Sequence, residues 1–419
     1  MEWLNVFNSI IGLLFSVCYL YQYIYIVIAF FKKPKKFPET DVRHRYAILV
    51  SARDEEKVIG QLCDSIQKQD YPSELIDLHV IADNCSDKTA EVAASRGATV
   101  HVRKDPSRVG KGYALQFVLD RIRQEKGEDY YDAYFVIDAD NLLDPSYVSE
   151  MNKAFSAGHR IVTSYRNSKN YADNWISSGY SLWFLREARQ LNAVRFTLGT
   201  SCVVAGTGFM ISKEIIKRQG GWKHFLMTED TEFTVENMLL GEKIAYCHDA
   251  VFYDEQPVRF SQSWRQRKRW AKGYLQVLGH YGGRMIAAIF RGNFSCFDML
   301  MSLSPAFFIS IASVVVNLAA ALYAALFLPS ALLPILLGLL NTALSAYAIF
   351  LVVALTTVIL EWKRIRATTL QKILSIFTLP LFIATYIPIS FSAIFTKAEW
   401  KPIEHTVAVS VEDLERVEK

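Results

Sequence analysis

The sequence predicts an α/β domain with a largely parallel sheet, inserted between transmembrane α-helices. Of its 419 residues, 51% are hydrophobic and 21% are charged, and the two kinds are segregated along the chain. Between about residues 40 and 290, segments with strand-like and helix-like patterns alternate. This alternation is typical of β-α-β units with a parallel sheet. We therefore expect a water-soluble block that is held at a membrane.

Runs without charged residues predict the membrane helices, at 3–31, 299–328, 331–360 and 373–395. Each is longer than the roughly 20 residues with which a helix crosses about 30 Å of hydrocarbon. The fourth run contains Pro380 and Pro388. It therefore either spans the bilayer or re-enters it, and the side of the C-terminus stays open.

Basic flanks predict the orientation. The first run ends in FKKPKK and the third in EWKRIR, and such clusters mark the cytoplasmic side. The first run is too long for a signal peptide. We expect a multi-pass plasma-membrane protein with its α/β domain in the cytosol. The expected parts are an N-terminal helix with its flank (1–36), the cytosolic domain (37–258), interfacial amphipathic helices (259–297), transmembrane helices (298–396) and a tail (397–419). The cysteines lack C-x-x-C spacing, which disfavours zinc.

Strand-like and helical segments alternate along the cytosolic block. Four segments have a strand-like pattern: RYAILVSAR, LHVIADNC, ATVHVRK and DAYFVIDAD. The three segments between them have helical spacing: EKVIGQLCDSIQKQ, DKTAEVAASRG and GYALQFVLDRIRQE. Asp87 is a candidate helix cap and Gly97 a candidate stop. Further on, VVAGTGFMIS is strand-like with a glycine bend at 206–208, and TEDTEFTVENMLLGE is helical with Thr228 as its cap.

Acidic residues follow the predicted strands. Asp54 comes after the first strand, Asp83 after the second, and Asp138 and Asp140 end the strand DAYFVIDAD. Ligands of parallel sheets bind beyond the carboxyl ends of the strands. Two carboxylates so close can share one divalent ion, and Mg²⁺ takes one or two carboxylates together with substrate phosphates. Alternatively, such a residue is a turn or cap aspartate, which is an equally good interpretation of Asp87.

Two other segments carry candidate chemistry. Around Lys111, the phosphate-loop pattern fails, because Asp105 replaces its first glycine and Gly112 its Ser or Thr. A kinase or ATPase is therefore disfavoured, although Lys111 could contact a diphosphate. Glu229 and Asp230 begin a helix, where acids often only complement the dipole. Because a candidate metal pair precedes them and a cationic segment follows them, we also consider that one of these two acids is a catalytic base.

The cationic segment SWRQRKRWAKG occupies residues 263–273. We interpret Gln266, Arg269 and Trp270 as site residues. The other cations, Arg265, Arg267, Lys268 and Lys272, are expected to face lipid headgroups from an interfacial helix. The alternative is that all five cations are membrane anchors.

In this order, Asp54, Asp83, D-A-D at 138–140, T-E-D at 228–230 and Q-R-K-R-W at 266–270 resemble the membrane-embedded family 2 glycosyltransferases. These include the cellulose, hyaluronan, poly-N-acetylglucosamine and mixed-linkage β-glucan synthases. The resemblance covers about residues 45–275. It implies a GT-A (Rossmann-like) fold, inverting transfer from a UDP-sugar, and Mg²⁺ or Mn²⁺ as cofactor.

The resemblance also implies roles on the donor side. Uracil and ribose would be held by residues after the first two strands, and the rest of the donor by residues nearer the third strand and the cationic segment. The nucleotide-sugar set is Ala52, Asp54, Glu55, Asp83, Lys111, Asp138, Gln266, Arg269 and Trp270. Asp140, with Asp138, would ligate the metal at the diphosphate.

On the acceptor side, the resemblance makes Asp230 the base that deprotonates the acceptor hydroxyl, with Glu229 beside it. Trp270 would offer its flat face to the acceptor sugar, and Gly206 and Thr207 would complete the acceptor site. Trp400 and His405 of the tail could cover the site if the tail is cytosolic.

Three functions remain open. The leading interpretation is a processive synthase that transfers glucose from UDP-glucose to a growing β-glucan and translocates it, with a variant that uses UDP-N-acetylglucosamine. The second is a transferase that adds one sugar to a lipid-linked acceptor. The third is a non-catalytic subunit of an export complex. The expected partners are the UDP-sugar, the glycan acceptor and the lipid bilayer, with no nucleic acid.

Overall fold

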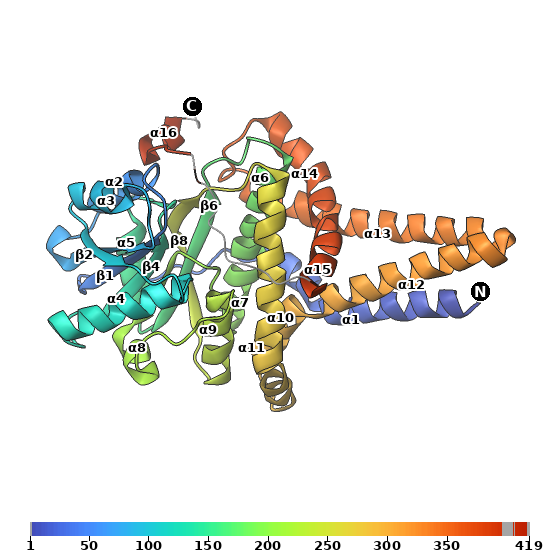
Figure 1. Cartoon of the computed structure of the whole chain (residues 1–419), viewed down its shortest axis with the longest axis horizontal. Coiled ribbons are helices and arrows are strands. Elements are labelled where there is room, and N and C mark those ends of the chain that lie inside the picture. Colours follow the sequence, from blue (N-terminus) through green and yellow to red (C-terminus); the bar gives the residue numbers. More distant parts are fainter. Residues whose placement is uncertain (1, 396–404, 406, 417–419) are drawn as a thin grey trace.

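The computed structural model describes residues 2–395, 405 and 407–416, which form a sheet domain and a helical extension (Figure 1). Within these residues, eight strands make one sheet in the order β3-β2-β1-β4-β7-β6-β8-β5. The strands are β1 Tyr46–Ala52, β2 Ile76–Asp83, β3 Thr99–Arg103, β4 Ala133–Asp138, β5 Leu142–Leu143, β6 Ile161–Ser168, β7 Phe209–Ser212 and β8 Ile244–Asp254.

The first half of the sheet is parallel, as the sequence predicts, and the second half is mixed. β1 pairs in parallel with β2 and β4, and β2 with β3. β7 runs antiparallel to β4 and β6, and β5 antiparallel to β8. The prediction for VVAGTGFMIS is only half right, because the strand begins at Phe209, after the glycine bend.

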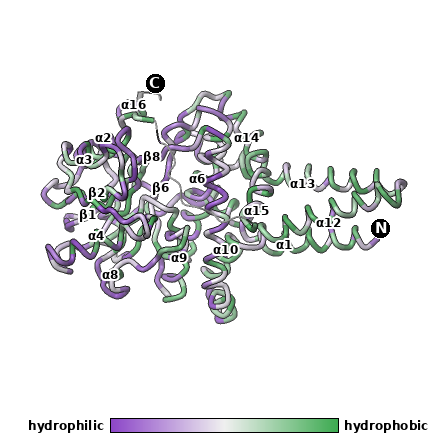
Figure 2. Tube along the Cα trace, in the orientation of Figure 1, coloured by the Kyte–Doolittle hydropathy of each residue, from purple (hydrophilic) through white to green (hydrophobic). Residues whose placement is uncertain are grey.

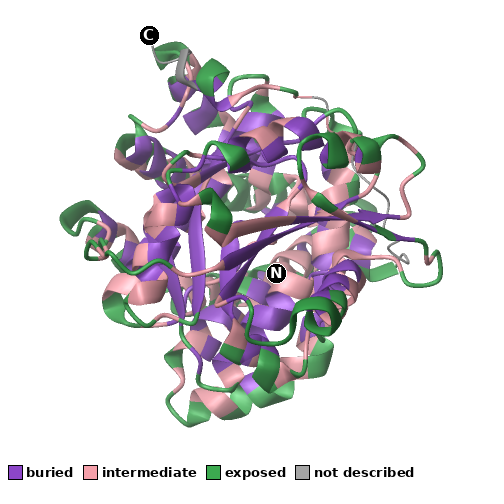
Figure 3. Ribbon diagram, turned by 90° about the vertical axis from the view of Figure 1, so that its left-hand side faces the viewer, coloured by how far each residue is buried: buried purple, intermediate pink, exposed green. Residues whose placement is uncertain are grey.

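β1 is apolar except at Ser51, because both faces of the sheet are covered. Tyr46, Ile48 and Val50 pack into one core, and Ala47 and Leu49 into the other. The first face is covered by α2 Ile59–Gln67, α3 Thr89–Ser95 and α5 Tyr147–Ser156, and the second by α4 Lys111–Lys126, α8 Lys213–Gln219 and α9 Glu229–Leu239. Figure 3 shows the buried strands at the centre of these helices.

The helical extension consists of α1 Glu2–Phe31, α12 Pro305–Phe327 and α13 Pro329–Glu361, which project together from the sheet domain (Figure 1). They are apolar along their length (Figure 2), and most of their side chains face outward, as membrane helices require. The run predicted from residue 299 is in fact two helices, because α11 Phe294–Leu303 ends at Ser304, before Pro305.

The fourth apolar run is broken into α14 Thr369–Ala384 and α15 Tyr386–Phe395. A proline ring clashes with the carbonyl four residues earlier; for Pro388 this is Ala384, the last residue of α14. By length and composition the whole run, 369–395, could span a membrane. Of its two helices, α15 packs on α10, whereas α14 packs on α13 and α6.

The two parts meet at α10 Phe260–Phe290, a single helix, and at the segment α6 Trp175–Arg186, η2 Glu187–Asn192 and α7 Ala193–Leu198. The prediction for Arg267 is wrong, because it is fully buried rather than at the lipid surface. It donates hydrogen bonds to Phe382 O and Thr385 Oγ1, at 3.2 and 2.7 Å. Its guanidinium lies over the rings of Phe382 and Tyr386.

Two short helices complete the described chain. η1 Ser73–Leu75 precedes β2, and α16 Val411–Arg416 packs on the sheet domain. In α16, Val411 and Leu414 are buried against Leu142 of β5 and Tyr253 of β8.

Candidate functional site

The carboxyl ends of β1, β2 and β4 bring the predicted donor residues to one edge of the sheet. Ser51 of β1 is in register with Asp138 of β4. After β1, Asp54 adopts a left-handed backbone with φ 57°, a conformation that Asp and Asn tolerate better than most residues. Its Oδ1 accepts hydrogen bonds from Ser86 N and Oγ, at 2.6 and 3.1 Å, which ties the loop after β1 to the loop after β2.

Asp83 and Asp87 serve different purposes. Asp83 is buried and pairs with Arg103 Nη1 at 2.6 Å. Burial raises the pKa of the Asp83 carboxyl, and the Arg103 guanidinium opposes this. Asp87 accepts from Thr89 N at 3.0 Å at the start of α3, so it stabilises the turn there. Ala52 lies buried at the end of β1 between these loops.

Asp138 lies beside the loop at 205–208. Lys111, at the start of α4, forms an ion pair with Asp138 and donates to Gly206 O at 2.8 Å. Asp138 N donates to Thr207 Oγ1 at 2.8 Å. Gly208 has φ 68°, and a Cβ there would lie 2.1 Å from the Phe252 ring, so only glycine fits this bend. The loop predicted for the acceptor therefore lies directly against the D-A-D residues.

Asp140 is only 5% exposed and lies in an acidic pocket. Burial raises its pKa well above the usual range, and Asp254 and Asp138 add to this, while His405 and Lys169 oppose it. Within the described residues, three ligand-type side chains approach within 4.8 Å of one another only at Asp54, Cys85 and Asp87. Asp138 and Asp140 are not part of that group. Together they would offer two carboxylates, which is within the one or two that Mg²⁺ takes alongside substrate phosphates.

His405 reaches this pocket from the tail. Its Nδ1 lies 2.9 and 3.0 Å from the carboxylate oxygens of Glu55, and its Nε2 lies 3.8 Å from Asp140 Oδ2. Burial lowers the pKa of His405, but Asp140 and Glu55 outweigh burial and raise it to about 10. The tail therefore brings an imidazolium cation to the acidic edge. Trp400 lies outside the described residues.

Asp230 lies next to the loop at 205–208. A Cβ built on Gly206 would be 3.8 Å from Asp230 Oδ2. Burial and the neighbouring Asp230 raise the pKa of Glu229 to about 7, while Lys111 and Arg269 act to lower it. The pKa of Asp230 is raised by burial, and Lys111 and Arg269 again oppose. Thr228 stands at the cap position of α9 as predicted, but its side chain makes no capping hydrogen bond.

The cationic segment closes the other side from α10. Arg269 Nε and Gln266 Oε1 are buried and have no hydrogen-bond partner among the described residues. Because buried polar groups normally have partners, these atoms fit a site for a charged, polar ligand. Trp270 packs edge-on against Tyr180 and Phe184, with ring centroids 5.9 and 6.2 Å apart.

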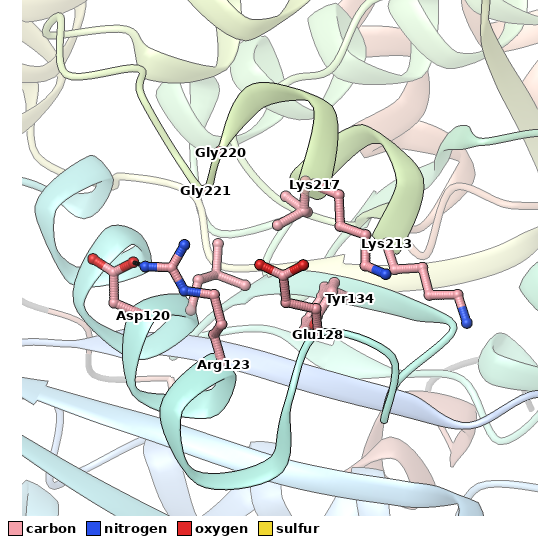
Figure 4. Close-up of a pocket in the computed structure, with 10 residues that line it drawn as sticks. Asp120, Arg123, Glu128, Tyr134, Lys213, Lys217, Gly220 and Gly221 are labelled. Carbon is pink, nitrogen blue, oxygen red and sulfur yellow. Dashed lines mark hydrogen bonds and ion pairs between the residues drawn. The ribbon is translucent and has the colours of Figure 1, made fainter.

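Sequence reasoning missed Arg166, Glu187 and Asp254, for which no motif gives a signal. Arg166 Nε donates to Asp254 Oδ2 at 2.9 Å, and its guanidinium lies 3.7 Å from the Phe184 ring centroid. A cavity of about 20 Å³ is lined by Arg166, Phe184, Glu187 and Thr207, among others. A second cavity, of about 30 Å³, lies between α4 and α8 and shares no lining residue with this site (Figure 4).

The arrangement is suited to group transfer from an anionic donor. Lys111 and Arg269 are two cations within electrostatic reach of Asp230. Cations fixed beside a reaction centre can stabilise the negative charge that develops on a leaving group. Arginine suits such a group because its planar fork is always charged. A carboxylate with a raised pKa beside these cations can accept a proton from a hydroxyl.

The comparisons with known proteins agree with this arrangement. A model described as "Glycosyltransferase like family 2" matches residues 44–273, more than half of the chain. A "Probable glycosyltransferase YdaM" of Bacillus subtilis is 25% identical over 56% of this chain and 56% of its own length. A "Beta-monoglucosyldiacylglycerol synthase" of Trichormus variabilis is 27% identical over 61% of this chain and 54% of its own.

A "Poly-beta-1,6-N-acetyl-D-glucosamine synthase" of Staphylococcus epidermidis is 22% identical over 55% of each chain. This chain thus matches about half the length of these curated relatives. Among solved structures, a mannosyltransferase of Pyrobaculum calidifontis in complex with GDP-Man and Mn²⁺ has a TM-score of 0.59 at 17% identity, over 93% of this chain and 99% of its own. That likeness confirms the predicted GT-A fold. With the matched family model, it follows that this chain is a family 2 glycosyltransferase.

Proposed function

We propose that this enzyme transfers a single sugar, with inversion, from a UDP-sugar to a lipid-linked acceptor at the cytosolic face of the membrane. The observation that carries this proposal is the position of Asp230, between the donor edge of the sheet and α10, against which the kinked α15 packs. An acceptor anchored in the bilayer would reach Asp230 from that side. The β-monoglucosyldiacylglycerol synthases among the relatives are consistent with a lipid product.

In the proposed reaction, Asp230 accepts the proton of the acceptor hydroxyl, which attacks the anomeric carbon from the face opposite the UDP. One base is sufficient for inversion. Arg269 and Lys111 stabilise the departing diphosphate. The carboxylates of Asp138 and Asp140 fit a divalent cation, Mg²⁺ or Mn²⁺, which would neutralise the diphosphate when bound. Trp270 orients the acceptor next to Asp230.

The helical extension favours one lipid acceptor over a translocated polymer. α1 packs on α12, and α12 packs on α13, through small side chains such as Ala320, Ala321 and Ala324. Because these helices pack directly on one another through small side chains, we take them as a membrane anchor and not as a path for a sugar chain. The second helix of the broken fourth run, α15, packs on α10 (Figure 1).

Processive synthesis of a β-linked polysaccharide remains the second candidate. It is favoured by the Q-x-x-R-W pattern at 266–270 and by the poly-β-1,6-N-acetylglucosamine synthase among the relatives. In that case a further copy or another subunit would have to supply the path for the polymer.

Product analysis tests the proposal. Membranes that contain the enzyme are incubated with radiolabelled UDP-glucose, UDP-N-acetylglucosamine or GDP-mannose, and the products are separated into lipid-soluble and polymeric fractions. We expect one labelled glycolipid, lost on addition of EDTA and restored by Mg²⁺ or Mn²⁺. Asp230→Asn should abolish its formation, whereas Glu214→Gln, an exposed glutamate on α8, should not. A high-molecular-weight polymer would establish the second candidate instead, and full turnover by Asp230→Asn would contradict both.

A further inference from the structure

Glu187, at the proposed acceptor side, is a carboxylate with no hydrogen-bond or ion-pair partner among the residues that the structure describes. It begins the π-helical turn Glu187–Asn192 between α6 and α7. Such turns are rare and are concentrated at functional sites. Glu187 is partly buried, yet it forms no hydrogen bond through its side chain and no ion pair with any residue that the structure describes. A half-buried carboxylate of this kind keeps acceptor positions that water or a ligand hydroxyl can fill.

The cavity that Glu187 lines adjoins the loop at 205–208. Ala205 and Thr207 of this loop form one wall and Phe184 another. Gly206, between the two loop residues, faces Asp230. Phe184 in turn contacts Trp270. With a volume of about 20 Å³, the cavity accommodates one group the size of a water molecule or a hydroxyl.

Three arginines near Glu187 act on its carboxylate electrostatically but form no hydrogen bond with it among the described residues. Burial raises the pKa of Glu187, while Arg195, Arg166 and Arg186 act to lower it. Each of these arginines is engaged elsewhere: Arg195 with Asp298 at 2.7 Å, Arg166 with Asp254, and Arg186 with Gln22 at 2.5 Å.

Tyr274, one turn after Trp270 on α10, lies near both Glu187 and the candidate base Asp230. Burial raises the pKa of Tyr274, and the carboxylates of Asp230 and Glu187 both add to this. Tyr274 therefore lies within electrostatic reach of both acids. A polar acceptor beside Trp270 would be in reach of both carboxylates.

We propose that Glu187 accepts hydrogen bonds from hydroxyl groups of the acceptor, and that the acceptor headgroup is therefore a sugar or similar polyol. This inference rests on the proposed function. A lipid with one hydroxyl presents that hydroxyl to Asp230 and leaves Glu187 facing apolar chain, which is unfavourable. A sugar headgroup can place one hydroxyl at Asp230 and another at Glu187.

The test compares two acceptors with identical acyl chains, diacylglycerol and hexosyl-diacylglycerol, with purified enzyme in nanodiscs. We expect the wild type to prefer the hexosyl lipid. Glu187→Gln and Glu187→Ala should raise the KM for this lipid about 10-fold or more, the usual effect of losing a hydrogen bond to a charged group. The same variants should lose far less activity towards diacylglycerol. UDP binding and Tm report whether each variant is folded, and Glu214→Gln is the control.

Two results would overturn the inference: equal use of both lipids by the wild type, or an equal loss for both lipids in the Glu187 variants. If the wild type makes polymer and no glycolipid, the proposed function fails. The Glu187 variants are then assayed for affinity towards an oligosaccharide acceptor, which is also a polyol. Unchanged affinity there would overturn the role of Glu187 as well.

Discussion

Replacement of Gly273 by alanine should move α10, which carries Arg269 and Trp270, away from the start of α9, which carries Asp230. Gly273 lies on α10, one turn after Arg269 and Trp270, and is buried against Thr228 of the T-E-D segment. A Cβ on Gly273 would lie 2.5 Å from Thr228 Cγ2, 2.6 Å from its Oγ1 and 3.0 Å from its Cβ. Rotation of the threonine cannot relieve all of these contacts, because its Cβ is itself too close.

The magnitude follows from these distances. Ordinary carbon contacts begin at 3.4 Å, so α10 and the start of α9 must separate by roughly 1 Å. That shift moves Arg269 and Trp270 relative to Asp230, and a displacement of about 1 Å at a catalytic site can cost about 100-fold in rate. Alanine is a better helix former than glycine by about 1 kcal/mol, so the helix itself should not be weakened. We expect kcat/KM to fall about 10- to 100-fold while Tm stays within a few degrees.

The assay is glycolipid formation by purified variants, with Gly279→Ala as the matched control. Gly279 lies on the same helix, and a Cβ there would meet nothing within 4 Å. We expect Gly279→Ala to retain wild-type activity, and Thr228→Ala to restore part of the activity of Gly273→Ala by removing the two closest atoms. Equal activity of the two single variants would refute the idea that this contact sets the geometry of the site.

Three further predictions concern charge, packing and the tail. Because burial and Asp230 raise the pKa of Glu229 to about 7, Glu229→Gln removes a like charge, and the acidic limb of the kcat/KM profile should move to lower pH; an unmoved limb would argue against coupling of the pair. Arg267→Ala should lower the free energy of unfolding by about 2–4 kcal/mol, seen as a lower Tm, because two hydrogen bonds and its ring contacts are lost. The control Arg265→Ala, at an exposed position, should change stability by less than about 0.5 kcal/mol. Equal effects of the two variants would contradict the buried position of Arg267. Leu414→Ala, at a buried position of α16, should release the tail and speed amide exchange across 405–416, and unchanged exchange would show that Leu414 does not anchor it.

The sequence correctly placed Asp54, Asp83 and Asp138 at one edge of the sheet, because long, mostly apolar strands such as β1 and β4 set the geometry there. A residue that follows a strand must lie at the sheet edge, wherever the rest of the chain goes. The mixed half of the sheet was less predictable, since β5 and β7 are short and take their direction from their partners. Local pattern alone does not fix such strands.

The sequence also did not predict which face of α10 points into the protein. Arg265, Arg267 and Arg269 alternate along the chain, but successive pairs lie about 200° apart around a helix. Which of them points inward depends on α14 and α15, whose position follows from tertiary packing. Glu187 carried no signal, because in the segment LREARQLNAVR a glutamate beside Arg186 and Arg189 looks like an ordinary charged helix residue. The acceptor side, built from packed helices, is thus harder to predict than the strand ends.

The course of the chain after α13 bears on how many apolar segments cross the bilayer. His405 contacts Glu55, and α16 packs on β5 and β8, so the tail and the sheet domain share one side. A fourth full span would have put the tail on the opposite side. At 1.5 Å per residue, α14 is about 24 Å long and α15 about 15 Å, so neither alone crosses about 30 Å of hydrocarbon. This arrangement favours three spans, α1, α12 and α13, with α15 packed on α10 and α14 on α13 and α6. The break before Pro388 thus allows α15 to pack on α10, the helix that carries Arg269 and Trp270.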